Sequence, residues 1–162
     1  MPITIVVLKG YKYRLYPTEE QKVSLNKNFG CVRHIYNWAL NTKIKAYDKD
    51  KSSISCFTLT NDLPKLKKVK TWLKEVDSQS LQMAIRNLDT AYKNFFRKVK
   101  LGKGDPGFPN FKSRKDEQSF QLPQRARIDF KAGTLTLPKL GAIKAVFHRQ
   151  FDGKVKTTTI SR

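Results

Sequence analysis

The sequence predicts an α+β protein in which a small antiparallel β-barrel is split by an inserted α-helical bundle. Two observations carry this prediction. Runs typical of β-strands occupy residues 3–16 and recur five times after residue 116, whereas residues 18–101 space their apolar side chains as helices do. The expected units are therefore residues 1–17, the first strand of the barrel; residues 18–115, the helical bundle; and residues 116–162, the remainder of the barrel.

The first predicted strand covers residues 3–16. It begins with β-branched residues, after which Tyr11, Tyr13 and Leu15 alternate with polar or basic neighbours. Pro17 ends the strand. Thr18 and Gln21 then have the spacing of a capping box, in which each side chain binds a free backbone N–H of the other residue. A helix is therefore expected to begin directly after Thr18.

Residues 18–47 are expected to form two helices separated at Gly30, a C-cap candidate. Val32, Ile35, Tyr36 and Ala39 have the spacing of the inner face of the second helix. A short helix, a glycine and a longer helix are typical of a helix-turn-helix pair that reads DNA. An ordinary αα-hairpin at the start of a bundle has the same pattern, so both interpretations stay open.

Two further helices are expected before residue 102. The polar residues 48–55 predict a loop, and residues 57–69 predict a helix with Asn61 or Asp62 near its start and Pro64 in its first turn. After a tight connection at residues 71–76, residues 78–101 carry the most regular helical pattern of the chain. The glycines and proline of residues 102–107 end that helix.

Short β-type runs follow, separated by turn residues. These runs are residues 120–122, 127–130, 134–137, 142–148 and 155–160. Regularly spaced short strands are typical of a small barrel or sandwich. The simplest topology joins them to the first strand in one barrel, so that the helices form an insertion.

The charge of the chain points to a polyanionic partner. Of 162 residues, 33 are Lys or Arg and 13 are Asp or Glu, which gives a net charge of +20. Such an excess destabilises a compact chain unless a polyanion neutralises it, and nucleic acid is the expected partner. An anionic membrane is the competing partner. It is disfavoured because the basic residues follow the whole chain rather than one amphipathic segment, and no apolar run is long enough to span a bilayer.

The segment from Lys93 to Lys115 combines eight basic residues, one acid and several aromatic side chains. Aromatic rings beside cations suit stacking on bases with neutralisation of phosphates. Phe108 and Phe111 could instead anchor a solvated hinge to the core. The residues expected to contact nucleic acid are Tyr11, Lys12, Arg14, Arg33, Asn37, Asn41, Arg86, Lys93, Arg97, Lys98, Phe111, Lys112, Arg114, Lys115, Arg125, Arg127, Arg149 and Lys156.

No catalytic or metal-binding constellation is expected in this chain. Cys31, His34, Cys56 and His148 could supply zinc ligands, but no Cys-x-x-Cys pair is present, and a buried thiol is the preferred interpretation of Cys31. The acids are spaced as caps and turns, without the convergent carboxylates that a nuclease needs for metal ions. We therefore expect no cofactor and no catalytic activity from the chain alone. The two cysteines indicate a reducing cytoplasm.

Six segments in order resemble the TnpB proteins, which are OrfB-type transposases of bacterial and archaeal insertion sequences and relatives of type V CRISPR nucleases. The segments are residues 10–17 (GYKYRLYP), 29–37 (FGCVRHIYN), 72–76 (WLKEV), 88–96 (LDTAYKNFF), 107–112 (GFPNFK) and 137–141 (LPKLG). Each is weak alone, and the ordered series, which covers the whole chain, is specific.

The resemblance implies a division of labour. In the family, the barrel is called the wedge, the helices form the recognition bundle, and together they hold a transposon-end guide RNA and read a motif beside the target DNA duplex. A RuvC-like nuclease domain, with Mg²⁺ and Zn²⁺ sites, follows in full-length members and is not expected here. By position, the target-motif readers would be Thr60, Ser78, Gln82 and Gln124. The resemblance places the protein in the bacterial or archaeal cytoplasm, associated with the nucleoid.

Two other functions remain compatible with the residues alone. A self-standing regulator could use the helix-turn-helix pair on DNA without an RNA. A basic structural RNA-binding protein would also account for the charge. Copurification of RNA separates the first of these from an RNA-guided protein. The sequence leaves the oligomeric state open.

Overall fold

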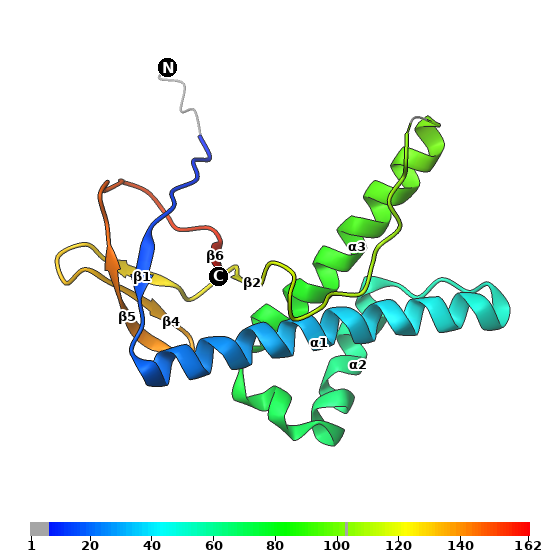
Figure 1. Ribbon diagram of the computed structural model, residues 1–162, viewed down its shortest axis with the longest axis horizontal. Coiled ribbons are helices and arrows are strands. Elements are labelled where there is room, and N and C mark those ends of the chain that lie inside the picture. Colours follow the sequence, from blue (N-terminus) through cyan, green and yellow to red (C-terminus); the bar gives the residue numbers. More distant parts are fainter. Residues whose placement is uncertain (1–6, 103) are drawn as a thin grey trace, which may run out of the picture.

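The computed structural model describes residues 7–102 and 104–162 and contains helices and two antiparallel sheets (Figure 1). The helical elements are α1 (Glu19–Asp50), α2 (Cys56–Val69), a 3₁₀ turn (Thr71–Glu75) and α3 (Ser78–Leu101). The strands are β1 (Arg14–Tyr16), β2 (Ser119–Leu122), β3 (Arg127–Asp129), β4 (Thr134–Leu137), β5 (Gly141–Val146) and β6 (Thr158–Ser161). The α+β class is thereby confirmed.

α1 is one continuous helix of 32 residues, so the expected helix pair with a break at Gly30 is wrong. The capping box is present as expected: the Gln21 amide donates to Thr18 Oγ1 at 3.3 Å, and the Thr18 amide donates to Gln21 Oε1 at 3.0 Å. The buried stripe of α1 continues through the glycine, with Leu25 and Phe29 before it and Val32 after it. Packing of this stripe outweighs the roughly 1 kcal/mol that glycine costs in a helix.

α2 begins earlier than the sequence indicates. Ser55 is its N-cap and accepts a hydrogen bond from the Thr58 amide at 3.1 Å, in place of the expected Asn61 or Asp62. Pro64 consequently lies inside the helix and not in its first turn. α3 has the expected bounds, with Asp77 as its N-cap and Gly102 in the left-handed conformation as its C-cap.

The strands form two sheets, and a single closed barrel is not confirmed. One sheet has the order β1-β5-β4-β3, and the other pairs β2 with β6. β1 pairs with β5, with Leu15 opposite Ala145, although the whole helical region lies between these strands in the sequence. The expected long first strand is shorter: only Arg14–Tyr16 is a strand, residues 7–13 have no regular secondary structure, and the part before residue 7 lies outside the described residues. The last run is also shorter, because β6 begins at Thr158.

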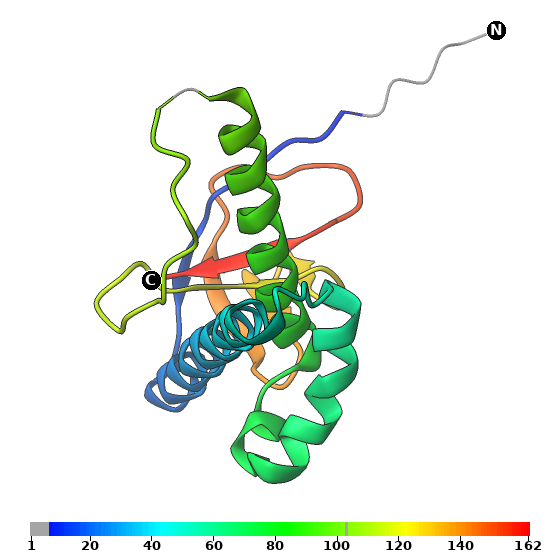
Figure 2. The same cartoon turned by 90° about the vertical axis from the view of Figure 1, so that its right-hand side faces the viewer.

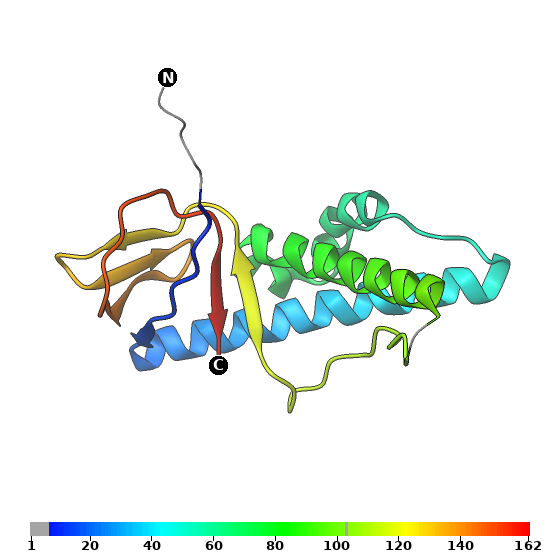
Figure 3. The ribbon, with the colours of Figure 1, turned by 90° about the horizontal axis from the view of Figure 1, so that it is seen from above.

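One hydrophobic core joins helices and sheets. The rings of Phe29 on α1 and Phe120 on β2 meet edge to face, with centroids 5.3 Å apart. β2 packs between α1 and α3 at one end of the bundle (Figure 3), and Ile143 and Leu137 close the core from the other sheet. The Lys139 ammonium donates to the carbonyls of Lys74 and Val76 and so ties the β4–β5 turn to the 3₁₀ turn that precedes α3. None of the described helices is long and apolar enough to cross a bilayer.

Candidate nucleic-acid interface

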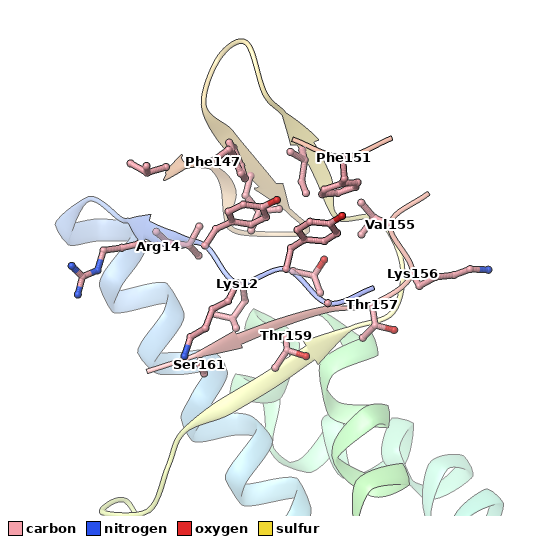
Figure 4. Close-up of a pocket in the computed structure, with 18 of the residues that line it drawn as sticks. Lys12, Arg14, Phe147, Phe151, Val155, Lys156, Thr157, Thr159 and Ser161 are labelled. Carbon is pink, nitrogen blue, oxygen red and sulfur yellow. The ribbon is translucent and has the colours of Figure 1, made fainter. Parts of the chain in front are cut away.

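A groove of about 1560 Å³ lies between the segment at residues 7–17, the segment at residues 146–162 and the first turns of α1. It forms because β1 adds to the edge of β5 while β6 pairs with β2, which places the segment that leads into β1 beside the segment that leads into β6 (Figure 3). Lys12, Arg14 and Lys156 extend from the backbone around it (Figure 4). Three residues that the sequence nominates for nucleic-acid contact thus share one hollow.

The groove carries a strong excess of positive charge. Asp152 is its single carboxylate among the lining residues. Its cations are Lys9, Lys12, Arg14, Lys22, Lys154, Lys156 and Arg162. Within the described residues only Lys22 of this set has an ion-pair partner, Glu19, at 2.6 Å. The other cations therefore keep their charge available for an anionic ligand.

Aromatic rings form one wall of this groove. Tyr11 stacks on Phe151 with centroids 4.8 Å apart and lies parallel to Tyr13 at 6.2 Å. Tyr13 also meets Phe147 edge to face at 4.9 Å, and its hydroxyl donates to the Arg149 carbonyl at 2.7 Å. These contacts fix the otherwise irregular N-terminal segment against the sheet (Figure 4).

A smaller hollow of about 610 Å³ adjoins the same wall. It shares Phe151 and Lys154 with the groove and adds the nominated residues Arg125 and Arg127. Arg125 has a φ of 68°, an unusual value for a residue other than glycine. The preceding residue, Gln124, is held by its amide, which donates to Gln79 Oε1 at 2.9 Å. Gln79 is therefore a positioning contact that the sequence patterns do not reveal.

Residues 112–118, which we call the basic turn, lie against α1. The two polar atoms of the Asn37 side chain bind the backbone of Lys112: Nδ2 donates to the carbonyl at 2.9 Å and Oδ1 accepts from the amide at 2.8 Å. The Lys112 ammonium lies 4.4 Å from the Tyr36 ring centroid. Arg33 donates to Gln118 Oε1 at 2.9 Å. Arg33 and Asn37 therefore hold this turn, and the nucleic-acid contact expected for them stays a prediction.

The basic turn and the groove adjoin each other. The Arg162 amide donates to the Gln118 carbonyl at 3.0 Å, next to the pairing of Ser119 with Ser161. Arg114 and Lys115 are exposed on the turn, and Arg162 lines the groove. The basic turn and the groove therefore meet where Arg162 pairs with Gln118.

The far half of α3 projects from the core (Figure 2), so the predicted apolar stripe is buried only as far as Leu88. Phe108 packs edge to face on Tyr92 and Phe95, at 5.5 and 5.3 Å between centroids. Phe108 therefore anchors the segment after α3. Phe96 and Phe111 remain 61% and 54% exposed.

The remaining nominated residues lie on the helices. Lys93, Arg97 and Lys98 are exposed on the projecting part of α3, where Lys93 pairs with Asp89 at 2.8 Å. Arg86 is exposed nearer the start of α3, and Asn41 is half-buried on α1. These positions lie outside the set of residues that line the groove.

The four expected target-motif readers lie on α2, on α3 and beyond β2. The Thr60 hydroxyl donates back to the Cys56 carbonyl at 2.8 Å, and Ser78 Oγ accepts from the Lys67 ammonium at 2.5 Å. Gln82 is half-buried on α3, one helical turn from Ser78. Gln124 is exposed, and its backbone amide is held by Gln79. Ser78 and Gln124 are thus brought to the start of α3, and their role in reading DNA stays a prediction.

The thiol of Cys31 is buried in α1, and burial raises its pKa to about 11. Across residues 7–102 and 104–162, no group of three His, Cys, Asp or Glu side chains is placed to hold a metal ion. The zinc arrangement considered from the sequence is therefore not assembled in the described part of the chain.

Comparisons with known proteins bear on this surface. A family model described as a helix-turn-helix domain, that of the OrfB proteins of IS605-type elements, matches residues 1–52. The chain is 32% identical over 157 residues to InsQ of Escherichia coli K12, a candidate RNA-guided DNA endonuclease. It is 37% identical over 135 residues to another candidate RNA-guided DNA endonuclease, from Streptomyces pristinaespiralis. This chain belongs to the TnpB family.

The chain spans about a third of these two family members, 38% of InsQ and 32% of the Streptomyces protein, whereas the matches cover 96% and 82% of the chain itself. A third relative, the virulence protein VsdF of Salmonella dublin, is 37% identical over 121 residues and is covered over 95% of its length. In this TnpB-family structure, residues 7–52, the described part of the region that the helix-turn-helix family model matches, contain one helix, α1.

Proposed function

We propose that this chain is the nucleic-acid-binding part of a mobile-element RNA-guided DNA endonuclease, with a transposon-end guide RNA and a target DNA duplex as its partners. The two sheets would correspond to the wedge, formed by residues 1–17 and 116–162, and the helices of residues 18–115 to the recognition bundle. Membership of the TnpB family and the names of the two longer relatives support this assignment.

The observation that carries the proposal is the cation-lined groove, which the basic turn adjoins. The groove is lined by seven Lys or Arg side chains and one Asp, and phosphates are the ligand that such a surface favours. The basic turn adds three cations beside Asp116 and Glu117. The aromatic wall beside these cations includes Tyr11, which stacks on Phe151 and remains 39% exposed, so an unpaired base could contact it. The surface therefore suits an RNA segment at least as well as a DNA duplex.

We also propose that the nuclease chemistry, with its Mg²⁺ and Zn²⁺, belongs to the longer members of the family. Several acids of this chain serve local structure: Asp77 caps α3, Asp105 accepts from the Gly107 amide, and Asp129 accepts from two amides of its turn. Carboxylates used in this way are poorly placed for metal-ion catalysis. With Mg²⁺ and guide RNA present, the chain should leave a target duplex intact.

A self-standing DNA-binding role is the second candidate, because VsdF consists almost entirely of the matched region. The helix pair on which that role was first based is absent, since residues 19–50 form one helix. The two candidate functions differ in whether the chain must bind RNA. After expression without added nuclease, RNA that copurifies with the chain and resists exchange by DNA favours the guide-RNA role.

The groove is tested by replacing Lys12, Arg14 and Lys156 with alanine. If eight phosphates are neutralised, the parent should show a log–log salt slope of about −7 on duplex DNA, and the triple variant a slope shallower by about three units. The matched control replaces Lys45, Lys49 and Lys68, which are exposed outside the groove, and removes the same charge. Equal losses in both variants would show that the groove has no special role.

A further inference from the structure

The basic turn is attached to α1 at both of its ends. At the first end, Asn37 pairs with the backbone of Lys112 through two hydrogen bonds, 75 residues away in the sequence. At the second end, Arg33 binds the Gln118 side chain. Arg33 and Asn37 lie one helical turn apart on the same face of α1, so a single rigid helix sets the distance between the two attachments.

Hydrogen bonds within the turn fix the backbone between these attachments. Asp116 Oδ2 accepts from the Ser113 amide at 2.6 Å, and Ser113 Oγ accepts from the Lys115 amide at 3.1 Å. Gln118 Nε2 donates to the carbonyls of Ser113 and Asp116, at 3.2 and 2.7 Å. Arg114 and Lys115 are exposed and make none of these side-chain contacts. The turn therefore holds two free cations on an ordered backbone that has no regular secondary structure.

We propose that Asn37 is a positioning residue that orders the basic turn, so that Arg114 and Lys115 meet phosphates of a bound polynucleotide from a preformed backbone. The proposal rests on the proposed function, because it requires a polynucleotide on this surface. The Asn37 amide already makes a two-bond contact with Lys112, through one N–H and the oxygen, so the same edge of the amide cannot also make a two-bond contact with a base unless the turn is released. Ordering the backbone before binding removes an entropic cost that binding would otherwise carry.

The first measurement is amide hydrogen exchange in the full chain, with no ligand. Replacing Asn37 with alanine should speed exchange at Lys112 and Ser113, while core amides of α1 around Ile35 and Leu40 keep their protection. Asn61→Ala, an exposed asparagine on α2, is the matched control and should change neither. Unchanged exchange at Lys112 and Ser113 in Asn37→Ala would overturn the ordering role.

The second measurement is a mutant cycle on binding to a short DNA duplex and to a matched single-stranded RNA. Asn37→Ala should weaken binding about tenfold and leave the salt slope unchanged, because the same cations still reach phosphate at a higher entropic cost. Replacing Arg114 and Lys115 with alanine should make the slope on duplex shallower by about two units. In that double variant, Asn37→Ala should have no further effect.

The outcomes separate the alternatives. Additive losses would mean that Asn37 contacts the polynucleotide itself, and the positioning role would be rejected. If the parent chain binds neither probe, the proposed function fails and the phosphate role of the turn fails with it. The exchange result then still decides whether Asn37 orders the turn, so the two failures are distinguishable.

Discussion

Asn37, Gln79 and Gln118 each use a side-chain amide to bind the backbone of a segment without regular secondary structure. Such segments leave backbone N–H and C=O groups without ladder partners, and side-chain amides can satisfy both kinds of group. Each contact lies next to exposed basic residues. At the scale of single residues, these amides hold the irregular segments that carry the cations.

His34 allows a residue-scale prediction on pH. Its Nε2 is buried without a partner among the described residues, and its ring lies 5.0 Å from that of Trp72. Burial, and then the nearby Lys70, lower the pKa of His34 below its ordinary value of 6.5. The unfolded chain therefore binds the proton first, so the contribution of neutral His34 is complete above about pH 6.5 and is lost as the pH falls towards its folded pKa.

The measurement is the free energy of unfolding in urea between about pH 8 and about pH 5, compared with a His34→Phe variant that keeps an aromatic ring beside Trp72. As the pH falls, the free energy of unfolding of the parent should decrease relative to that of the variant. If the difference in the free energy of unfolding does not change with pH, protonation of His34 does not destabilise the folded protein. Comparing differences removes the contribution of carboxylates common to both proteins.

At the scale of elements, α1 organises the molecule. Its N-terminal turns border the groove through Lys22 and Leu25, and its middle holds the basic turn. Phe29 and Val32, on either side of Gly30, are both buried, so a turn at that glycine would expose apolar surface. Continuity of the helix therefore follows from burial and keeps both cationic regions on one rigid support.

Replacing Gly30 and Gly102 with alanine tests the continuity of α1, because the two substitutions should change the stability of the protein in opposite directions. A Cβ would meet no atom within 4 Å at either site, so only the backbone conformation differs. Gly30→Ala should stabilise the protein by about 0.5–1 kcal/mol, because alanine favours the helix interior. Gly102→Ala should destabilise it by about 1 kcal/mol or more, because its φ of 62° is strained for alanine.

Thermal unfolding gives the readout, with shifts of roughly 2–4 °C per kcal/mol for a chain of this size. The Gly102→Ala variant is the positive control: it shows that the assay detects the loss of stability when alanine replaces a glycine in the left-handed conformation. If Gly30→Ala lowered the melting temperature by a similar amount, Gly30 would be a helix C-cap and α1 would be two helices.

At the scale of the whole molecule, the positive charge is largely uncompensated. The ion pairs among the described residues involve four lysines, each paired on the surface, against a net charge of +20. Exposed pairs of this kind contribute at most about 1 kcal/mol each. Repulsion between the remaining cations therefore opposes folding, and a bound polyanion relieves it.

A prediction at this scale follows for stability in the presence of salt and polyanion. Raising NaCl from low to moderate concentration should raise the melting temperature, because screening weakens self-repulsion. Single-stranded RNA at about 100 times its Kd should add about 2.7 kcal/mol of stability at low salt. Scanning fluorimetry measures both effects, with uncharged dextran as the control polymer. A melting temperature that changes with neither salt nor RNA would contradict the claim that repulsion between cations destabilises the folded protein.

Local patterns predicted much of the fold. The bounds of α3, the capping box of Thr18 with Gln21 and the approximate places of β2 to β5 follow from periodicity and turn residues. At Gly30 the prediction failed because tertiary packing of the buried stripe overrides a local signal. At Pro64 it failed because Ser55, rather than Asn61 or Asp62, caps α2, so that the proline lies inside the helix. Of the candidate site, Lys12, Arg14 and Lys156 were predicted as basic contacts, but nothing in their spacing indicates that they share a groove.

The sequence alone determined the α+β class, the excess of positive charge and the resemblance to TnpB proteins, because composition, periodicity and ordered motifs are properties of the chain itself. Only the tertiary structure decided that β1 joins β5 and that Asn37 serves Lys112, across 75 residues. Such pairings depend on which long-range contacts together bury the core and satisfy backbone groups. No local pattern contains that information, so the contact between Asn37 and Lys112 can be seen only in the tertiary structure.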